Sequence, residues 1–244
     1  MTLFMKNIFI IIFPLISIQV FAQAENINQY DQEGKRHGEW KKYYNDDGKN
    51  LRYEGKFQHG KEVGTFKFYK PNSKGKPAAT KTYVEEHDSI HMKFFTKKGR
   101  LESEGNLIDK DREGVWKYYK NGYKDNLMMT ENYQNGKLHG WKIIYFPDGK
   151  IMEKTYYQKG KKEGDLIIYA ENGEVLQEYR YKNNKLHGNS KVYNSRGQII
   201  SEGAYKQGHR DGKWRYYTEG KLDSIQKFPL PDPVKKKKRL NSRN

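Results

Sequence analysis

The chain of 244 residues carries a formal net charge of +17 and no cysteine, which excludes disulfide bonds, thiol chemistry and the lipid-bearing cysteine of a bacterial lipoprotein. Hydrophobic residues make up only 34% of the sequence, whereas 20 tyrosines help to raise the aromatic content to 14%. We therefore expect a thin core built mostly of aromatic side chains, because a tyrosine can bury its ring while its hydroxyl remains in contact with water. The excess of positive charge favours anionic surfaces as partners.

Residues 1–24 have the layout of a secretory signal peptide. Lys6 precedes an apolar run over residues 8–20, and small residues follow at Ala22 and Ala24. The run is short for a membrane span, and an uncleaved N-terminal anchor is the alternative interpretation. We expect an exported protein, periplasmic or extracellular, that is cleaved after Ala22 or Ala24. Nucleic acid is an unsuitable partner for such a chain.

A glycine-punctuated aromatic phrase then recurs seven times, for example as GKRHGEWKKYY from residue 34 and GHRDGKWRYY from residue 208. The second glycine of the phrase stands at Gly38, Gly64, Gly114, Gly140, Gly164, Gly188 and Gly212, and we assign these glycines a structural role. Their spacing is 24 or 26 residues, except for one interval of 50 residues that contains a degenerate copy of the repeat. A fixed period of this size marks an array of units that stack on their neighbours. Residues 25–228 are predicted to form one elongated domain of seven to eight repeats.

Each copy is predicted to be a β-hairpin. Asp or Asn precedes the last glycine of several copies, as in Asp47-Gly48 and Asn172-Gly173. Such pairs between stretches of alternating apolar residues are a strong hairpin signal, because the turn needs positive φ. The predicted fold is therefore all-β, an elongated antiparallel meander of hairpins in a single twisted sheet.

The first glycine of each phrase, such as Gly60, is expected to turn the chain into the next hairpin. Asn184 fits this role because Asn tolerates left-handed backbone geometry, whereas Lys110 departs from the rule. Pro71 and Pro77 fall where the second copy should turn, so that stretch is predicted to be a long turn or a bulged edge.

Alternation along a strand sorts the side chains of each copy into two faces. An aromatic residue stands four positions before the last glycine, at Tyr44, Phe95, Tyr118, Tyr145, Tyr169, Tyr193 and Tyr216. We expect these residues to share one face with the structural tryptophans Trp40, Trp116, Trp141 and Trp214, and with Ile143 and Ile167. The other face is expected to carry Lys41, Lys117, Lys142 and Arg215, and the second aromatics Tyr43, Tyr119 and Tyr217, which are candidate binding residues.

No catalytic, cofactor or metal site is predicted. His37, His139 and His187 recur in a His-Gly step, but equivalent residues of successive hairpins are about 10 Å apart, too far to share one ion. A hydrogen-bonding role at the turn suits these histidines better. Glutamates recur with the period at Glu54, Glu104, Glu153, Glu178 and Glu202, and a periodic acid suits a cross-strand partner of Lys or Arg better than a general base. We therefore expect a protein that is not an enzyme and has no small-molecule substrate.

The spacing of Gly, His-Gly, Trp and Tyr over residues 30–225 resembles the variant MORN repeat of bacterial proteins, including the YwqK-type proteins described as antitoxin components. The resemblance implies a meander of hairpins that acts as a protein-binding or lipid-binding scaffold. It also implies an alternative function, an antitoxin or immunity-type protein that neutralises a toxin by direct binding. An export signal does not suit a cytoplasmic immunity role.

Residues 229–244 are predicted to be a disordered basic tail. The run Lys235, Lys236, Lys237, Lys238 and Arg239 is a candidate contact with anionic surfaces, although such runs are usually solvated ends. Taken with the repeats, the sequence predicts an exported, non-enzymatic scaffold that contacts a protein or an anionic envelope component such as lipid or polysaccharide.

Overall fold

The computed structural model describes residues 26–45, 48–84, 88–120 and 126–229. The predicted signal peptide and the tail cations Lys235 to Arg239 lie outside these residues. The described strands are β1 (Gln29–Tyr30), β2 (Arg36–Tyr43), β3 (Leu51–Gln58), β4 (Lys61–Phe68), β5 (Ala79–Val84), β6 (Ser89–Phe95), β7 (Leu101–Ile108), β8 (Asp111–Tyr119), β9 (Leu127–Gln134), β10 (Lys137–Tyr145), β11 (Ile151–Gln158), β12 (Lys161–Tyr169), β13 (Val175–Lys182), β14 (Lys185–Leu186), β15 (Gly188–Tyr193), β16 (Ile199–Lys206), β17 (His209–Thr218) and β18 (Lys221–Phe228). Within these residues there is no helix long and apolar enough to span a bilayer.

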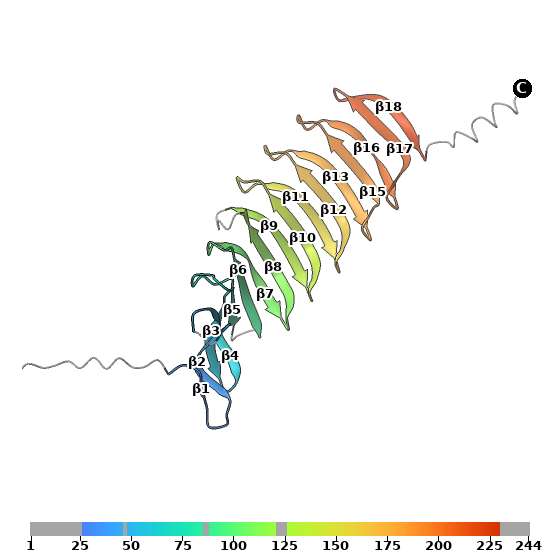
Figure 1. Ribbon diagram of the computed structural model, residues 1–244. Coiled ribbons are helices and arrows are strands. Elements are labelled where there is room, and N and C mark those ends of the chain that lie inside the picture. The colour runs from blue at the N-terminus through green and yellow to red at the C-terminus, as the bar shows by residue number, and fades with distance from the viewer. Residues whose placement is uncertain (1–25, 46–47, 85–87, 121–125, 230–244) are drawn as a thin grey trace, which may run out of the picture.

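The strands form one open antiparallel sheet of 18 strands. Neighbours in sequence pair with each other along the sheet, from β1 with β2 to β17 with β18, and β13 pairs with both β14 and β15. In Figure 1 the colour accordingly runs from blue to red along one elongated array, whose first strands are turned relative to the last. The predicted all-β meander of hairpins is confirmed.

In every phrase after the first, a tight turn joins consecutive strands where the first glycine of the phrase is expected. Two successive residues have positive φ at His59-Gly60, Asp109-Lys110, Asn135-Gly136, Lys159-Gly160, Asn183-Asn184 and Gln207-Gly208. Positive φ at both central residues defines the type I′ turn, whose twist matches that of the flanking strands. Lys110 adopts φ of 77°, so the turn is kept there despite the missing glycine.

The second glycine of the phrase lies inside a strand, at a β-bulge in which three residues lie opposite one. In β8, for example, Glu113 pairs with Asn106 and Lys117 with Glu104, so the three residues between them lie opposite Gly105 alone. The same count recurs in β4, β10, β12 and β17. Gly114 has φ of 67°, which an L-residue adopts only at a cost. The bulge brings the residue two positions later, Trp116, over the preceding strand.

The most deeply buried large side chains of the core are three of these overlying rings. Phe66, Trp116 and Trp214 are 1%, 1% and 2% exposed, although the sheet is a single layer. Each ring rests on a glycine eleven residues earlier, where a Cβ on Gly105 would come within 2.3 Å of Trp116 and one on Gly203 within 2.4 Å of Trp214. A side chain on that glycine would occupy the volume of the ring.

In copies that lack this glycine, other side chains occupy the two positions. In one copy Thr155 lies opposite Leu166, so the smaller residue still comes first. In the next copy Tyr179 stands eleven residues before Ser190, so the large residue comes first and the small one second. Glu131 lies opposite Lys142 as an ion pair of 3.2 Å. Size or charge is therefore matched copy by copy.

The register corrects the predicted faces in the central copies. Trp141 pairs with Tyr156 and Lys142 with Glu131, whereas Trp116 also pairs with Glu131. Lys142 therefore shares the face of Trp116, and Trp141 lies on the opposite face. Ile143, Ile167, Tyr145, Tyr169 and Tyr193 also lie opposite Trp40, Trp116 and Trp214, contrary to the prediction.

The reason for this error is loop length. Eight residues separate Gly114 from Gly122, but nine separate Gly140 from Gly149. Counting back from the last glycine therefore slips the central copies by one residue, and a slip of one exchanges the faces of a strand. We call the face of Trp40, Trp116 and Trp214 the tryptophan face, and the other the tyrosine face.

Candidate binding surface

A row of tyrosine–glutamate hydrogen bonds runs along the tyrosine face. The donor is a tyrosine five residues after the second glycine. The acceptor is a glutamate fifteen residues before that tyrosine. The hydroxyl-to-carboxylate distances are 2.6 Å for Tyr69–Glu54, 2.6 Å for Tyr119–Glu104, 3.0 Å for Tyr193–Glu178 and 2.8 Å for Tyr217–Glu202. This recurring partner was missed by sequence reasoning, although the spacing of fifteen residues is visible in the sequence.

Cations lie beside three of these four glutamates, as predicted for a periodic acid: Lys67 approaches Glu54 to 3.1 Å, Lys93 approaches Glu104 to 3.7 Å and Arg215 approaches Glu202 to 3.7 Å. The prediction does not hold for Glu153, which lies on the tryptophan face and accepts a hydrogen bond from Thr155 at 2.8 Å. The Tyr69 hydrogen bond holds the pKa of Glu54 below its usual value. Burial and the bond to Glu178 raise the pKa of Tyr193 to about 12. Each such pair at neutral pH is a phenol donating to a carboxylate, which is a structural contact.

Two of the three candidate binding tyrosines belong to this row. Tyr119 is buried, at 7% exposed, and donates to Glu104, while Tyr217 donates to Glu202. Tyr43 is half-buried on β2. All three stand at the same repeat position, five residues after Gly38, Gly114 and Gly212 respectively, and the structure does not bring them together.

The central copies break the chemistry of the tyrosine face. The position three residues after the second glycine is Lys41, Lys67, Lys117, Lys191 or Arg215 elsewhere, but Ile143 and Ile167 in β10 and β12. The glutamate of the row is replaced by Thr130 and Lys154 in the same region. An apolar segment thus interrupts an otherwise charged face.

Trp141 lies at the centre of this segment. It is 37% exposed, whereas the other three tryptophans are between 1% and 8% exposed. The Trp141 and Tyr156 rings meet edge to face with centroids 5.2 Å apart. The Lys154 ammonium lies 5.2 Å from the Trp141 centroid and 5.8 Å from that of Tyr169. We call the set Trp141, Ile143, Lys154, Tyr156, Ile167 and Tyr169 the Trp141 patch.

A shallow depression adjoins the Trp141 patch, lined by Asp165, Ile167, Glu178, Arg180 and Asn189. The Arg180 side chain is 66% exposed and pairs loosely with Asp165 at 3.6 Å. An exposed aromatic centre with a charged rim is the usual composition of a binding hot spot. No group among these side chains is arranged as a nucleophile with its base.

The three His-Gly histidines do not converge with one another. The only set of three potential metal ligands that meets among the described residues comprises Asp31, His37 and His59, in the first copy. The predicted hydrogen-bonding role is not seen for the His187 ring, because its Nδ1 is buried without a partner.

Comparison with known families supports the repeat assignment in part of the chain. Residues 142–159, 162–183 and 186–207 match the family described as MORN repeat variant. These stretches fall on β10 to β16 and include most of the Trp141 patch. No curated protein matches the chain. MORN repeats of the variant type are therefore present in this part of the chain.

Proposed function

We propose that this protein is an exported, non-enzymatic scaffold of MORN repeats that binds a protein partner through the Trp141 patch. The observation that carries the proposal is the position of Trp141. Three tryptophans are buried on the tryptophan face, but Trp141 is exposed on the opposite face among two isoleucines and two tyrosines. Nothing in the core requires an aromatic ring at this exposed position.

A protein is favoured over a small molecule because the surface is broad and shallow. Small ligands bind in concave pockets that cover most of their surface. Large aromatic anchors surrounded by charged groups, here Lys154 and Arg180, are instead typical of protein interfaces. The acidic rim at Asp165 and Glu178 also disfavours a uniformly anionic ligand at this patch.

Two parts of the proposal rest on the sequence beyond the described residues. Export rests on residues 1–24, and intact mass of the secreted chain should show a start at Gln23 or Glu25. Contact with an anionic envelope component rests on Lys235 to Arg239. Deletion of residues 229–244 should leave the thermal midpoint unchanged and weaken binding to anionic vesicles at low salt several-fold.

The central test compares Trp141→Ala with Val115→Ala, each made in the full chain. Val115 holds the same repeat position, one residue after the second glycine, and is 54% exposed on the same face. Partners captured from an envelope extract, quantified by mass spectrometry, should be lost with Trp141→Ala and kept with Val115→Ala. Equal capture by both variants, with unchanged circular dichroism, would refute the patch as the binding surface.

The antitoxin alternative makes a different prediction for the captured protein. A toxin partner should be encoded beside this gene and should become toxic when the gene is deleted. A scaffold partner should be harmless under the same deletion.

A further inference from the structure

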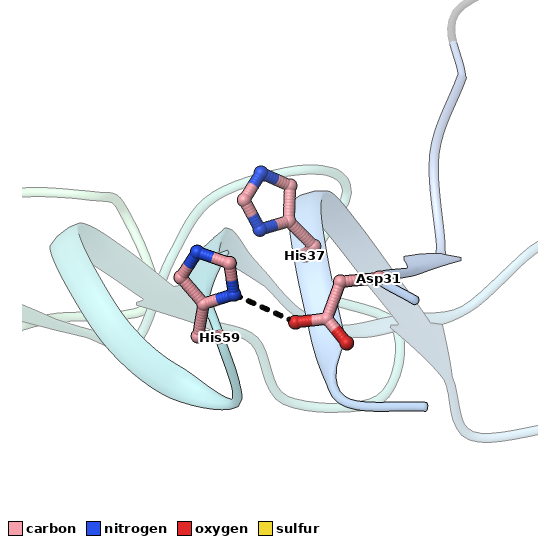
Figure 2. A group of neighbouring side chains, drawn as sticks. All are labelled: Asp31, His37 and His59. Carbon is pink, nitrogen blue, oxygen red and sulfur yellow. Dashed lines mark hydrogen bonds and ion pairs between the residues drawn. The ribbon is translucent and has the colours of Figure 1, made fainter. Parts of the chain in front are cut away.

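Three potential metal ligands converge at the N-terminal end of the array, from segments that are separate in sequence. Asp31 lies in the turn between β1 and β2, His37 on β2, and His59 in the turn between β3 and β4. Figure 2 shows the Asp31 carboxylate and the two imidazoles grouped on one side of these strands. One potential ligand atom from each residue lies within 4.8 Å of the others.

The separations are close to those of a metal site. His59 Nδ1 and Asp31 Oδ2 are 2.8 Å apart, and the two imidazole centroids are 5.0 Å apart with planes inclined at 59°. Bonds of about 2.0–2.1 Å to a tetrahedral ion place the ligand atoms about 3.4 Å apart. The ligand atoms of the three residues lie from 2.8 Å to at most 4.8 Å from one another, a range that includes this value.

The backbone holds the carboxylate in place. Asp31 Oδ1 accepts hydrogen bonds from the backbone N–H of Glu33 at 3.0 Å and of Lys35 at 2.9 Å, which leaves Oδ2 directed at His59. The bond from Lys35 keeps the pKa of Asp31 below its usual value, so the carboxylate is ionised. Such outer contacts orient ligands in known metal sites.

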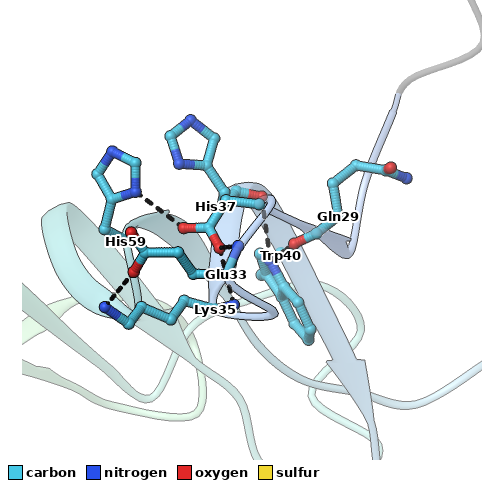
Figure 3. Close-up of polar contacts among 7 residues, drawn as sticks. Gln29, Glu33, Lys35, His37, Trp40 and His59 are labelled. Atoms are coloured by element: carbon cyan, nitrogen blue, oxygen red, sulfur yellow. Dashed lines mark hydrogen bonds and ion pairs between the residues drawn. The ribbon is translucent and has the colours of Figure 1, made fainter.

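The backbone of His37 is anchored as well. The indole Nε1–H of Trp40 lies 3.3 Å from the His37 carbonyl oxygen and 3.1 Å from that of Gln29, as Figure 3 shows. Among the residues that the structure describes, none donates to or accepts from the His37 ring nitrogens. The His37 imidazole is therefore placed beside His59 and Asp31 with its own nitrogens uncommitted.

We propose that Asp31, His37 and His59 bind a divalent transition metal ion of the zinc type. Two imidazoles and one carboxylate suit Zn²⁺ and its late first-row neighbours, whereas Ca²⁺ and Mg²⁺ prefer sites made of oxygen atoms. Three protein ligands leave the remaining coordination positions to water. The site requires only the first copy, so it is independent of the Trp141 patch on β10 to β12.

The ion would join the β1–β2 turn to the β3–β4 turn and so cap the end of the sheet. Terminal repeats of an array contact a neighbour on one side only and need their own stabilisation. Binding to the folded state alone raises the melting temperature with metal concentration. Protection from amide exchange should rise in residues 29–60 and not in β10 to β12.

The first test is calorimetric titration of Zn²⁺ into the full chain prepared without a histidine tag. We expect saturable binding of one ion per chain, with affinity lowered at least about tenfold by His37→Ala or His59→Ala. His139→Ala is the matched control, because His139 holds the His-Gly position of His37 in a later copy, and it should leave the affinity unchanged. Absence of one-to-one binding, or an equal loss in His139→Ala, would overturn the site.

A second variant separates loss of the ligand from loss of the fold. Asn at position 31 keeps an oxygen that accepts from Glu33 and Lys35 but removes the anionic ligand. Asp31→Asn should fold normally without metal and lose both the affinity and the zinc-dependent exchange protection of residues 29–60. If Asp31→Asn binds Zn²⁺ as the unaltered chain does, Asp31 and His59 form only an ordinary ion pair.

Discussion

A glycine beneath each of three large rings allows a single-layer sheet to have a buried core. Gly55, Gly105 and Gly203 give the rings of Phe66, Trp116 and Trp214 room against the backbone of the preceding strand. In the sequence a Glu-Gly pair places this glycine eleven residues before each of the three rings. The pair does not predict a contact with the ring until the bulge, which brings the ring over the preceding strand, is known. Sequence reasoning therefore identified the tryptophans and missed the glycines.

Gly105→Ala should destabilise the protein by about 1–3 kcal/mol, because the new Cβ overpacks the Trp116 ring. Its ideal position is 2.3 Å from Trp116 Cδ2. Gly105→Thr combined with Trp116→Leu should cost less than the sum of the two single changes, because Thr155 and Leu166 already pair in this way. Urea denaturation followed by circular dichroism measures the unaltered chain and these four variants, and strict additivity of Gly105→Thr and Trp116→Leu would contradict the pairing.

The tyrosine–glutamate row predicts an acid-dependent stability. The Tyr69 bond and Lys67 lower the pKa of Glu54 from 4.5 despite burial. A carboxylate with a lowered folded-state pKa stabilises the protein above the unfolded pKa, and this contribution is lost as pH falls through the folded one.

Tyr69→Phe should therefore cost about 1 kcal/mol at pH 7 and flatten the fall in stability below pH 4.5. Unfolding midpoints between neutral pH and acid test this prediction. Tyr30→Phe is the control, because Tyr30 is 63% exposed and outside the row. A parallel acid profile for Tyr69→Phe and the unaltered chain would show that the bond has no such role.

At the scale of the hairpin, turns could be predicted from sequence, whereas the faces could be predicted in the outer copies and not in the central ones. Gly60 and Asn184 marked their turns correctly because positive φ selects few residue types. The faces depend on register, and the register changes at the three-to-one bulge at the second glycine. The face of Trp141 was predicted by counting back from the last glycine of its copy. This count gave the wrong face, because the number of residues between the second and the last glycine is larger by one in this copy than in the copy of Trp116.

Lys110→Gly should stabilise the β7–β8 turn by about 0.5–1 kcal/mol, because Lys110 holds the left-handed conformation that glycine adopts freely. The reverse change, Gly160→Lys, is the matched control, since a Cβ at Gly160 meets no atom within 4 Å and only backbone strain is added. Thermal midpoints should move in opposite directions for the two variants. Movement in the same direction would mean that φ at this position does not control the turn.

At the scale of the whole molecule, the array is a chain of neighbour contacts with an uneven core. Buried aromatic rings cluster at Trp40, Phe57 and Phe66 and recur at Trp116 and Trp214, whereas Lys142 and Ser190 hold the same position in the central copies. Leu166, between them, is buried at this position, so the exchange is confined to the copy of Lys142, in which the aromatic ring lies outside as Trp141. The period alone predicted the array, but this exchange of faces required the register.

An array of this kind should respond locally to the loss of one ring, because each hairpin packs only on its neighbours. Removing a buried tryptophan costs about 3–5 kcal/mol at its site. Trp214 packs on β16, and its ring meets Tyr205 and Phe228 at 5.1 Å and 6.2 Å, all within the last three strands. Trp214→Ala should therefore remove amide-exchange protection from β16 to β18 and leave β2 to β8 unchanged.

Trp116→Ala is the internal comparison, because it lies between copies on both sides. Its loss should lower protection in β7 to β9 and spread toward β6 and β10, while β16 to β18 keep theirs. Exchange followed by mass spectrometry resolves these segments in one experiment. If either variant lowers protection uniformly from β2 to β18, the sheet unfolds as one cooperative unit, and coupling between hairpins exceeds the stability of any single copy.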